Sequence, residues 1–108
     1  IKRAVKVDDK PLTIVDIVET VCNHYNVTVT AVNRKSRKRN YVVERQVTMY
    51  LAQKFPKMPA SRIGKLVGNR DHSTVIHSCS KVEERLKIDA GFSDELVSIE
   101  NGLKVKRA

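Results

Sequence analysis

Residues 61–77 read SRIGKLVGNRDHSTVIH, two apolar stripes of helical spacing on either side of a short polar turn. The first stripe, in a short helix after Pro59, consists of Ile63, Leu66 and Val67. Ser61 is the expected N-cap of that helix, and Gly68 supplies its left-handed stop. Asp71 can cap the next helix. Two helices with so short a turn are typical of a helix-turn-helix, although plain helical bundles contain the same arrangement.

The helix after Asp71 is expected to run to about residue 87, with Val75, Cys79, Val82 and Leu86 inward and Ile76 at the margin. In a helix-turn-helix, the first residues of the second helix face base edges in the major groove. Asp71 can accept from cytosine N4, His72 can donate to a purine or pack on a thymine methyl, and Ser73 can bond either way. Arg70 and Thr74 are placed to hold phosphates.

The rest of the chain repeats the helical spacing, and we expect six helices, no sheet and therefore an all-α fold. Thr13 and Asp16 form a near capping box, Thr28 can cap a short turn, and Pro56 ends a helix. The helices outside the turn region are expected over residues 14–25, 42–55 and 93–104. The single expected core contains Val18, Val21, Val47, Leu51, Ile63, Leu66, Val75, Cys79 and Leu86.

The positive charge is concentrated in the middle of the chain. The net charge is +9, and residues 34–81 alone hold twelve basic residues against Glu44 and Asp71, which leaves +10 there. Such a patch favours an anionic partner, either nucleic acid or an acidic lipid surface.

A basic loop over residues 34–39 separates two expected helices. It is either a solvated charged loop, a localisation patch, or an arm that enters a minor groove beside the recognition helix. On the last interpretation Arg37 is the inserted side chain. Contacts with the phosphate backbone are then expected from Arg34, Lys35, Arg39, Arg45 and Gln46.

The run from Gly68 to His77 resembles the signature of the bacterial replication-initiator family DnaA. Arg37, then Arg45 and Gln46, then residues 49–52, are similar to the preceding loop and helix of that family at matching spacing. The resemblance covers roughly residues 12–104.

The resemblance implies an all-helical domain, related in fold to the Trp repressor, that binds a nine-base-pair DnaA box at the replication origin. It implies base contacts from Arg37, Asp71, His72 and Ser73. The backbone contacts that it implies come from Arg45, Gln46, Arg70, Thr74 and Ile76. It further implies a nucleotide-binding domain before residue 1, which would bind ATP; the residues present here are expected to need no cofactor. Acidic lipids and other initiator protomers are further expected partners.

Four residues depart from the pattern of the family. Asn69 stands where a second glycine is usual, and asparagine tolerates the left-handed geometry. The other departures are Gln53 in place of a basic residue, Arg62 in place of an acidic one, and Glu44 beside Arg45. A diverged paralogue or a phage regulator with the same domain therefore stays an alternative, as does a membrane or protein docking module.

Other functional classes find little support in the sequence. Catalysis is not expected, because there is no phosphate-binding glycine loop and no nucleophile with a plausible base. Cys22 and Cys79 fall on apolar helical faces and are expected to be buried free thiols. Residues 1–12 are interpreted as a linker or truncation edge and residues 13–108 as the DNA-binding domain, with a cytoplasmic location.

Overall fold

The computed structural model describes residues 12–29 and 42–107, and within them the chain is helical and has no strand. The all-α prediction is confirmed. Five of the six expected helices lie in these residues. The sixth is the short turn expected after Thr28, and this expectation extends into residues 30–41, which lie outside the described residues. The helices are α1 (Ile14–Tyr25), α3 (Val42–Lys54), α4 (Ala60–Leu66), α5 (His72–Ile88) and α6 (Ala90–Arg107).

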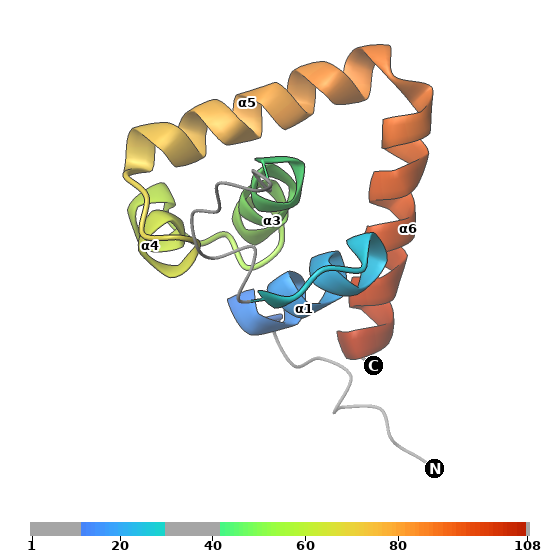
Figure 1. Cartoon of the computed structure of the whole chain (residues 1–108), viewed down its shortest axis with the longest axis horizontal. Helices are drawn as coiled ribbons and strands as arrows, with labels where there is room; N and C mark the ends of the chain where they lie inside the picture. The colour runs from blue at the N-terminus through green and yellow to red at the C-terminus, as the bar shows by residue number, and fades with distance from the viewer. Residues whose placement is uncertain (1–11, 30–41, 108) are drawn as a thin grey trace.

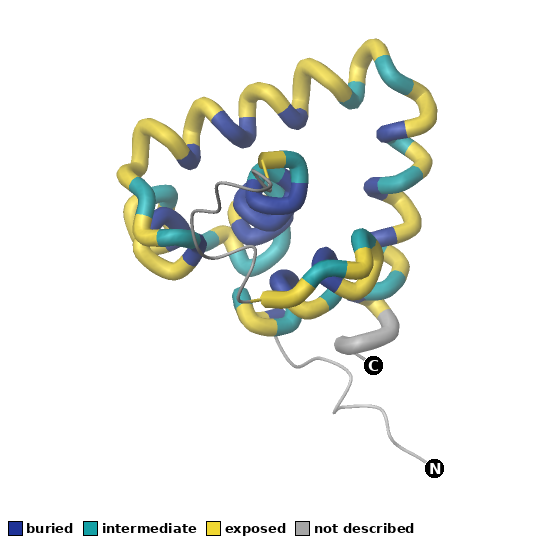
Figure 2. Tube along the Cα trace, in the orientation of Figure 1, coloured by how far each residue is buried: buried dark blue, intermediate teal, exposed yellow. Residues whose placement is uncertain are grey.

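Helix α3 is the centre of the fold. Helices α1, α4 and α5 all pack against it, and α6 closes the structure by packing on α1 and α5 (Figure 1). The buried part of α3 consequently extends around most of the helix (Figure 2). Thr48 is fully buried there, and its hydroxyl donates to the carbonyl oxygen of Glu44 at 2.8 Å. The polar group is thus satisfied inside the core.

Most of the predicted core is buried, with one clear exception. Leu66 is 43% exposed, so its assignment to the core was wrong. Ile63 and Val67, four residues apart, occupy the inward face of the short helix α4, and Leu66 instead lines an apolar groove against α1. Leu86 is half-buried, and Val18 packs with Cys22 in a second small cluster. Both cysteines are buried free thiols, as predicted.

Two of the predicted helix starts need correction. Ser61 is not the cap of α4: the helix begins at Ala60 after Pro59, whose extended backbone (φ −67°, ψ 147°) provides the N-cap without a side-chain hydrogen bond. Helix α6 begins at Ala90 rather than near residue 93. Gly91, a poor helix former, concealed this first turn in the sequence.

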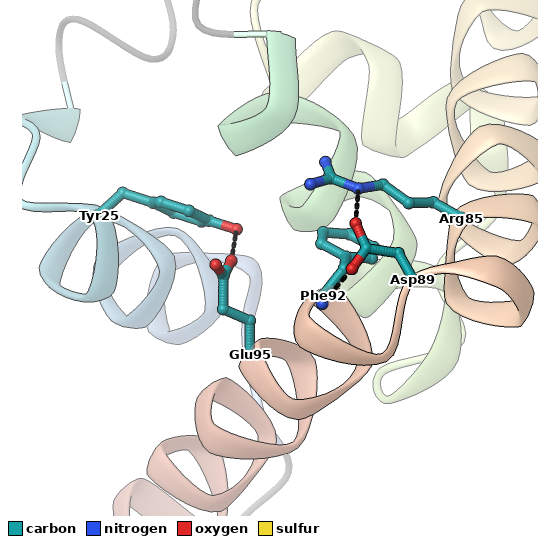
Figure 3. A network of polar contacts seen from close by, with 5 residues as sticks. All are labelled: Tyr25, Arg85, Asp89, Phe92 and Glu95. Atoms are coloured by element: carbon teal, nitrogen blue, oxygen red, sulfur yellow. Dashed lines mark hydrogen bonds and ion pairs between the residues drawn. The ribbon is translucent and has the colours of Figure 1, made fainter.

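A polar network fixes the sharp corner between α5 and α6 (Figure 3). Asp89 accepts from the backbone amide of Phe92 at 3.0 Å and from Nε of Arg85 at 3.3 Å. Both hydrogen bonds lower the pKa of Asp89, and the one from the amide of Phe92 has the larger effect. The guanidinium of Arg85 also lies over the ring of Phe92, 4.1 Å from its centroid. One carboxylate therefore joins the last turn of α5 to the first turn of α6.

Two hydrogen bonds between side chains of the described residues tie helix α6 to α1 and α3. The hydroxyl of Tyr25, at the end of α1, donates to Glu95 at 2.7 Å. Burial, followed by this hydrogen bond, raises the pKa of Tyr25. Lys54, at the end of α3, pairs with Glu100 at 3.0 Å. The capping box predicted for α1 is also confirmed, since Thr13 and Asp16 exchange both hydrogen bonds.

The contrast between two leucines tests this packing. Leu51→Ala should lower the free energy of unfolding by about 2–5 kcal/mol, because it leaves a cavity at the fully buried centre of α3. Leu66→Ala should cost about 1 kcal/mol or less, because the side chain is already partly in water. Urea unfolding followed by circular dichroism measures both. Equal losses for the two variants would contradict the placement of Leu66.

Candidate nucleic-acid interface

The turn between α4 and α5 is held by a backbone hydrogen bond between its two ends. The amide of Arg70 donates to the carbonyl oxygen of Gly64 at 2.6 Å. Between them, Gly68 and Asn69 have φ values of 74° and 51°, both in the left-handed region. The left-handed stop at Gly68 is confirmed, and Asn69 adopts the geometry for which the usual glycine is suited.

Gly64 allows the two helices to approach this closely. A Cβ atom at this position would overlap the carbonyl oxygen of Arg70 and lie 3.3 Å from Cγ2 of Val75. A glycine inside a helix costs about 1 kcal/mol relative to alanine, so it indicates a packing requirement. Sequence reasoning did not use this signal, although it locates the contact between α4 and α5.

Asp71 caps α5 as predicted. Its Oδ1 accepts from the backbone amide of Ser73 at 3.2 Å. The cap brings the predicted base-reading residues Asp71, His72 and Ser73 together at one helix end, and all three are exposed. Thr74 is exposed beside them. Val75 is completely buried, so one side of this turn rests on the core while the other faces solvent.

The predicted phosphate-binding residues differ in how accessible they are. Ile76 is 51% exposed on α5, whereas Arg45, on α3, is only 7% exposed. Burial, and then the positive charge of Arg70, lowers the pKa of Arg45, while Glu44 acts in the opposite direction. Glu44, one of the four departures from the family pattern, is itself buried. Its carboxylate therefore lies where its negative charge offsets the positive charge of Arg45.

Arg70 and Gln46 are both half-buried. The Nε atom of Arg70 is buried and has no hydrogen-bond partner. A buried guanidinium nitrogen without an acceptor is unusual in a folded protein. Arg34, Lys35, Arg37 and Arg39 lie in residues 30–41, outside the described residues, so the arm proposed to enter a minor groove stays a prediction.

A surface hollow of about 330 Å³ lies beside the turn, and we call it the turn hollow. Three of the residues that line it, Ser61 and Lys65 of α4 and Asn69 of the turn, were not among the predicted site residues. A basic residue in the helix before the turn is the signal that could have identified Lys65. The lining consists of Ser61, Lys65, Asn69, Arg70, Asp71 and His72.

Two other kinds of site have no support in the described residues. Across residues 12–29 and 42–107, His, Cys, Asp and Glu side chains form no group of three that could hold a metal ion. None of the helices in these residues is long and apolar enough to cross a membrane.

The family comparison agrees with this geometry. The model of the family described as "Bacterial dnaA protein helix-turn-helix" matches residues 14–82, which is more than half of the chain and runs from α1 into α5. The chain belongs to this family. The helix-turn-helix interpretation of α4 and α5 is therefore confirmed over the plain bundle.

Relatives in the DnaA family extend the match beyond residue 82. The chromosomal replication initiator protein DnaA of Bacteroides fragilis is 42% identical over 104 residues, which are 96% of this chain and 22% of that protein. The DnaA of Bacteroides thetaiotaomicron is 43% identical over 99 residues, 92% of this chain and 21% of that protein. The DnaA of Lachnoclostridium phytofermentans is 37% identical over 97 residues, which are 89% of this chain and 21% of that protein. The chain thus spans about a fifth of the length of these DnaA proteins.

Gly64→Ala tests the close approach on which the helix-turn-helix depends. The added methyl group should lower the free energy of unfolding by about 1–3 kcal/mol, because α4 and the start of α5 must separate. Gly91→Ala is the matched control, since its Cβ would meet only Asp89 Oδ1 at an ordinary 3.4 Å and alanine favours the helix. Thermal unfolding should show opposite signs for the two variants. A neutral Gly64→Ala would refute the backbone contact.

Proposed function

We propose that this chain binds double-stranded DNA in a sequence-specific manner, at DnaA boxes of a bacterial replication origin, through the N-terminal end of α5. The capped first turn of α5 carries this proposal. Asp71, His72 and Ser73 are exposed there together, while the opposite side of the helix rests on the core through Val75. A rigidly mounted helix end with polar side chains of this kind is what major-groove recognition requires.

The three residues offer complementary chemistry to base edges. The cap uses Oδ1 of Asp71, and no other hydrogen bond of this carboxylate is found within the described residues, so Oδ2 can accept from cytosine N4. His72 can donate to a purine N7 or O6, and the hydroxyl of Ser73 can donate or accept. The cap also fixes the direction of these side chains before DNA arrives, which reduces the entropy lost on binding.

The residues around the helix end are proposed to hold the sugar-phosphate backbone. Thr74 and Ile76 are exposed on α5, next to the base-reading turn. Arg70 and Arg45 lie close enough for their charges to interact, and an anion near both would offset their repulsion. Gln46 is the neighbour of Arg45 on α3. In the basic segment, Arg37 is proposed to enter the minor groove, with Arg34, Lys35 and Arg39 along the phosphates.

The wider role follows from the names of the relatives. Those proteins are named chromosomal replication initiators, and we propose that this chain supplies the DNA-binding step of such a protein. Nucleotide binding and contacts between protomers are proposed for other parts of a DnaA-type protein, because this chain matches only about a fifth of one. No catalytic step is assigned to this chain, and acidic lipids stay a proposed additional partner.

Asp71→Asn separates base reading from helix capping. Asparagine caps a helix about as well as aspartate does, so stability should be unchanged, but it presents an amide where cytosine needs an acceptor. Affinity for a box-containing duplex should fall by about 1–3 kcal/mol, while affinity for a scrambled duplex should stay the same or rise. Fluorescence anisotropy on both duplexes, at one fixed salt concentration, measures this.

Asp94→Asn is the control, because it makes the same chemical change at an exposed position of α6. It should leave the ratio of the two affinities as it is in the original chain. If Asp71→Asn also leaves that ratio unchanged, the first turn of α5 does not read bases and the proposed function is wrong in its recognition element.

A further inference from the structure

The turn hollow combines two cationic side chains from different elements. Lys65 belongs to α4 and Arg70 to the turn, whereas Asp71 is the single acidic residue of the lining. That carboxylate already accepts from the amide of Ser73. The lining of the hollow therefore carries a net positive charge, which favours the binding of an anion.

Neither cation is held away from the hollow by a partner on the protein. Lys65 is exposed and forms no ion pair within residues 12–29 and 42–107. Arg70 is half-buried and likewise forms no ion pair within these residues. Lys54, in contrast, pairs with Glu100 at 3.0 Å. Lys65 and Arg70 therefore retain unused capacity to bind an anion.

The position of Lys65 relative to the recognition helix is fixed by the backbone. Lys65 directly follows Gly64, whose carbonyl oxygen accepts from the amide of Arg70 at 2.6 Å. Arg70 in turn directly precedes the cap residue Asp71. Asp71 and His72 line the hollow as well. An anion in the turn hollow would therefore lie next to the side chains of Asp71 and His72, which are assigned to base reading.

On the basis of the proposed DNA binding, we propose that Lys65 binds one backbone phosphate of the duplex in the turn hollow, together with Arg70. The hollow, at about 330 Å³, is large enough for a phosphate group with bridging water, and it opens to solvent beside the helix that enters the groove. The first helix of a helix-turn-helix crosses the DNA backbone, which brings α4 next to phosphates. This contact sets how deeply the first turn of α5 enters the groove and carries no sequence information of its own.

Salt dependence provides the test of this contact. The logarithm of the binding constant falls linearly with the logarithm of the salt concentration, with a slope of about 0.9 per neutralised phosphate. Lys65→Ala should reduce the magnitude of this slope by about 0.9 on both a box-containing and a scrambled duplex, whereas Lys65→Arg should retain it. The ratio of the two affinities should be unchanged by either substitution.

Lys87→Ala is the matched control. Lys87 is also an exposed lysine, but it lies in the last turn of α5, about 22 Å along the helix from His72. Its loss should leave the slope unchanged. A slope that falls equally in Lys65→Ala and Lys87→Ala would reflect net charge alone and would overturn the proposal.

The position of the phosphate can be found by neutralising the DNA one phosphate at a time. A series of box-containing duplexes, each with one methylphosphonate, should include a position that weakens the original chain but has no further effect on Lys65→Ala. That position should lie beside the bases that Asp71→Asn affects. If every methylphosphonate acts on Lys65→Ala as strongly as on the original chain, Lys65 does not bind a phosphate.

The results also distinguish this proposal from the proposed function. If the original chain prefers the box and Lys65→Ala keeps the full salt slope, the site in the turn hollow is refuted and box recognition stands. If the original chain shows no preference for the box but Lys65→Ala reduces the slope, box recognition is refuted and the phosphate site stands.

Discussion

The hydrogen bond between the amide of Arg70 and the carbonyl oxygen of Gly64 is the constraint on which the interface depends. It requires a residue without a Cβ at position 64, because the carbonyl oxygen of Arg70 occupies that space. It also fixes where Asp71 begins α5 relative to α4. The exposed polar side chains at the start of α5 are thus positioned by backbone geometry, which is stiffer than side-chain packing alone.

Helix α3 connects this interface to the core. It packs against both helices of the helix-turn-helix and contributes Arg45, whose pKa is lowered by burial and by the charge of Arg70. Holding two like charges close together costs free energy in the unbound protein, and Glu44 offsets part of it. If a phosphate binds beside this pair as proposed, its negative charge would offset part of the remaining repulsion.

Local signals in the sequence were sufficient for much of the fold and the site. The capping box of α1, the left-handed stop at Gly68 and the cap by Asp71 each depend on residues within a few positions of one another, and all were predicted correctly. The exposure of Leu66 and the start of α6 depend on neighbours distant in sequence or on a glycine that masks a helix. Lys65 was not singled out, although it is a basic residue in the helix before the turn, because the hollow that it lines with Arg70 exists only once the turn has folded.

The fold holds the proposed contact residues Arg45 and Arg70 more firmly than the side chains of His72 and Ser73. The contacts proposed for Arg45 and Arg70 are embedded in the packing of α3 and the turn, so changing them also perturbs the fold. The side chains of His72 and Ser73 are exposed and contribute little to the core, so they can change at little cost in stability. The departures from the family pattern at Arg62 and Gln53 cost little stability for the same reason, because both side chains are exposed. If the first turn of α5 reads bases as proposed, one or two substitutions at its exposed positions can change the base preference, while the backbone contact at Gly64 and the two neighbouring arginines, Arg45 and Arg70, have to be retained.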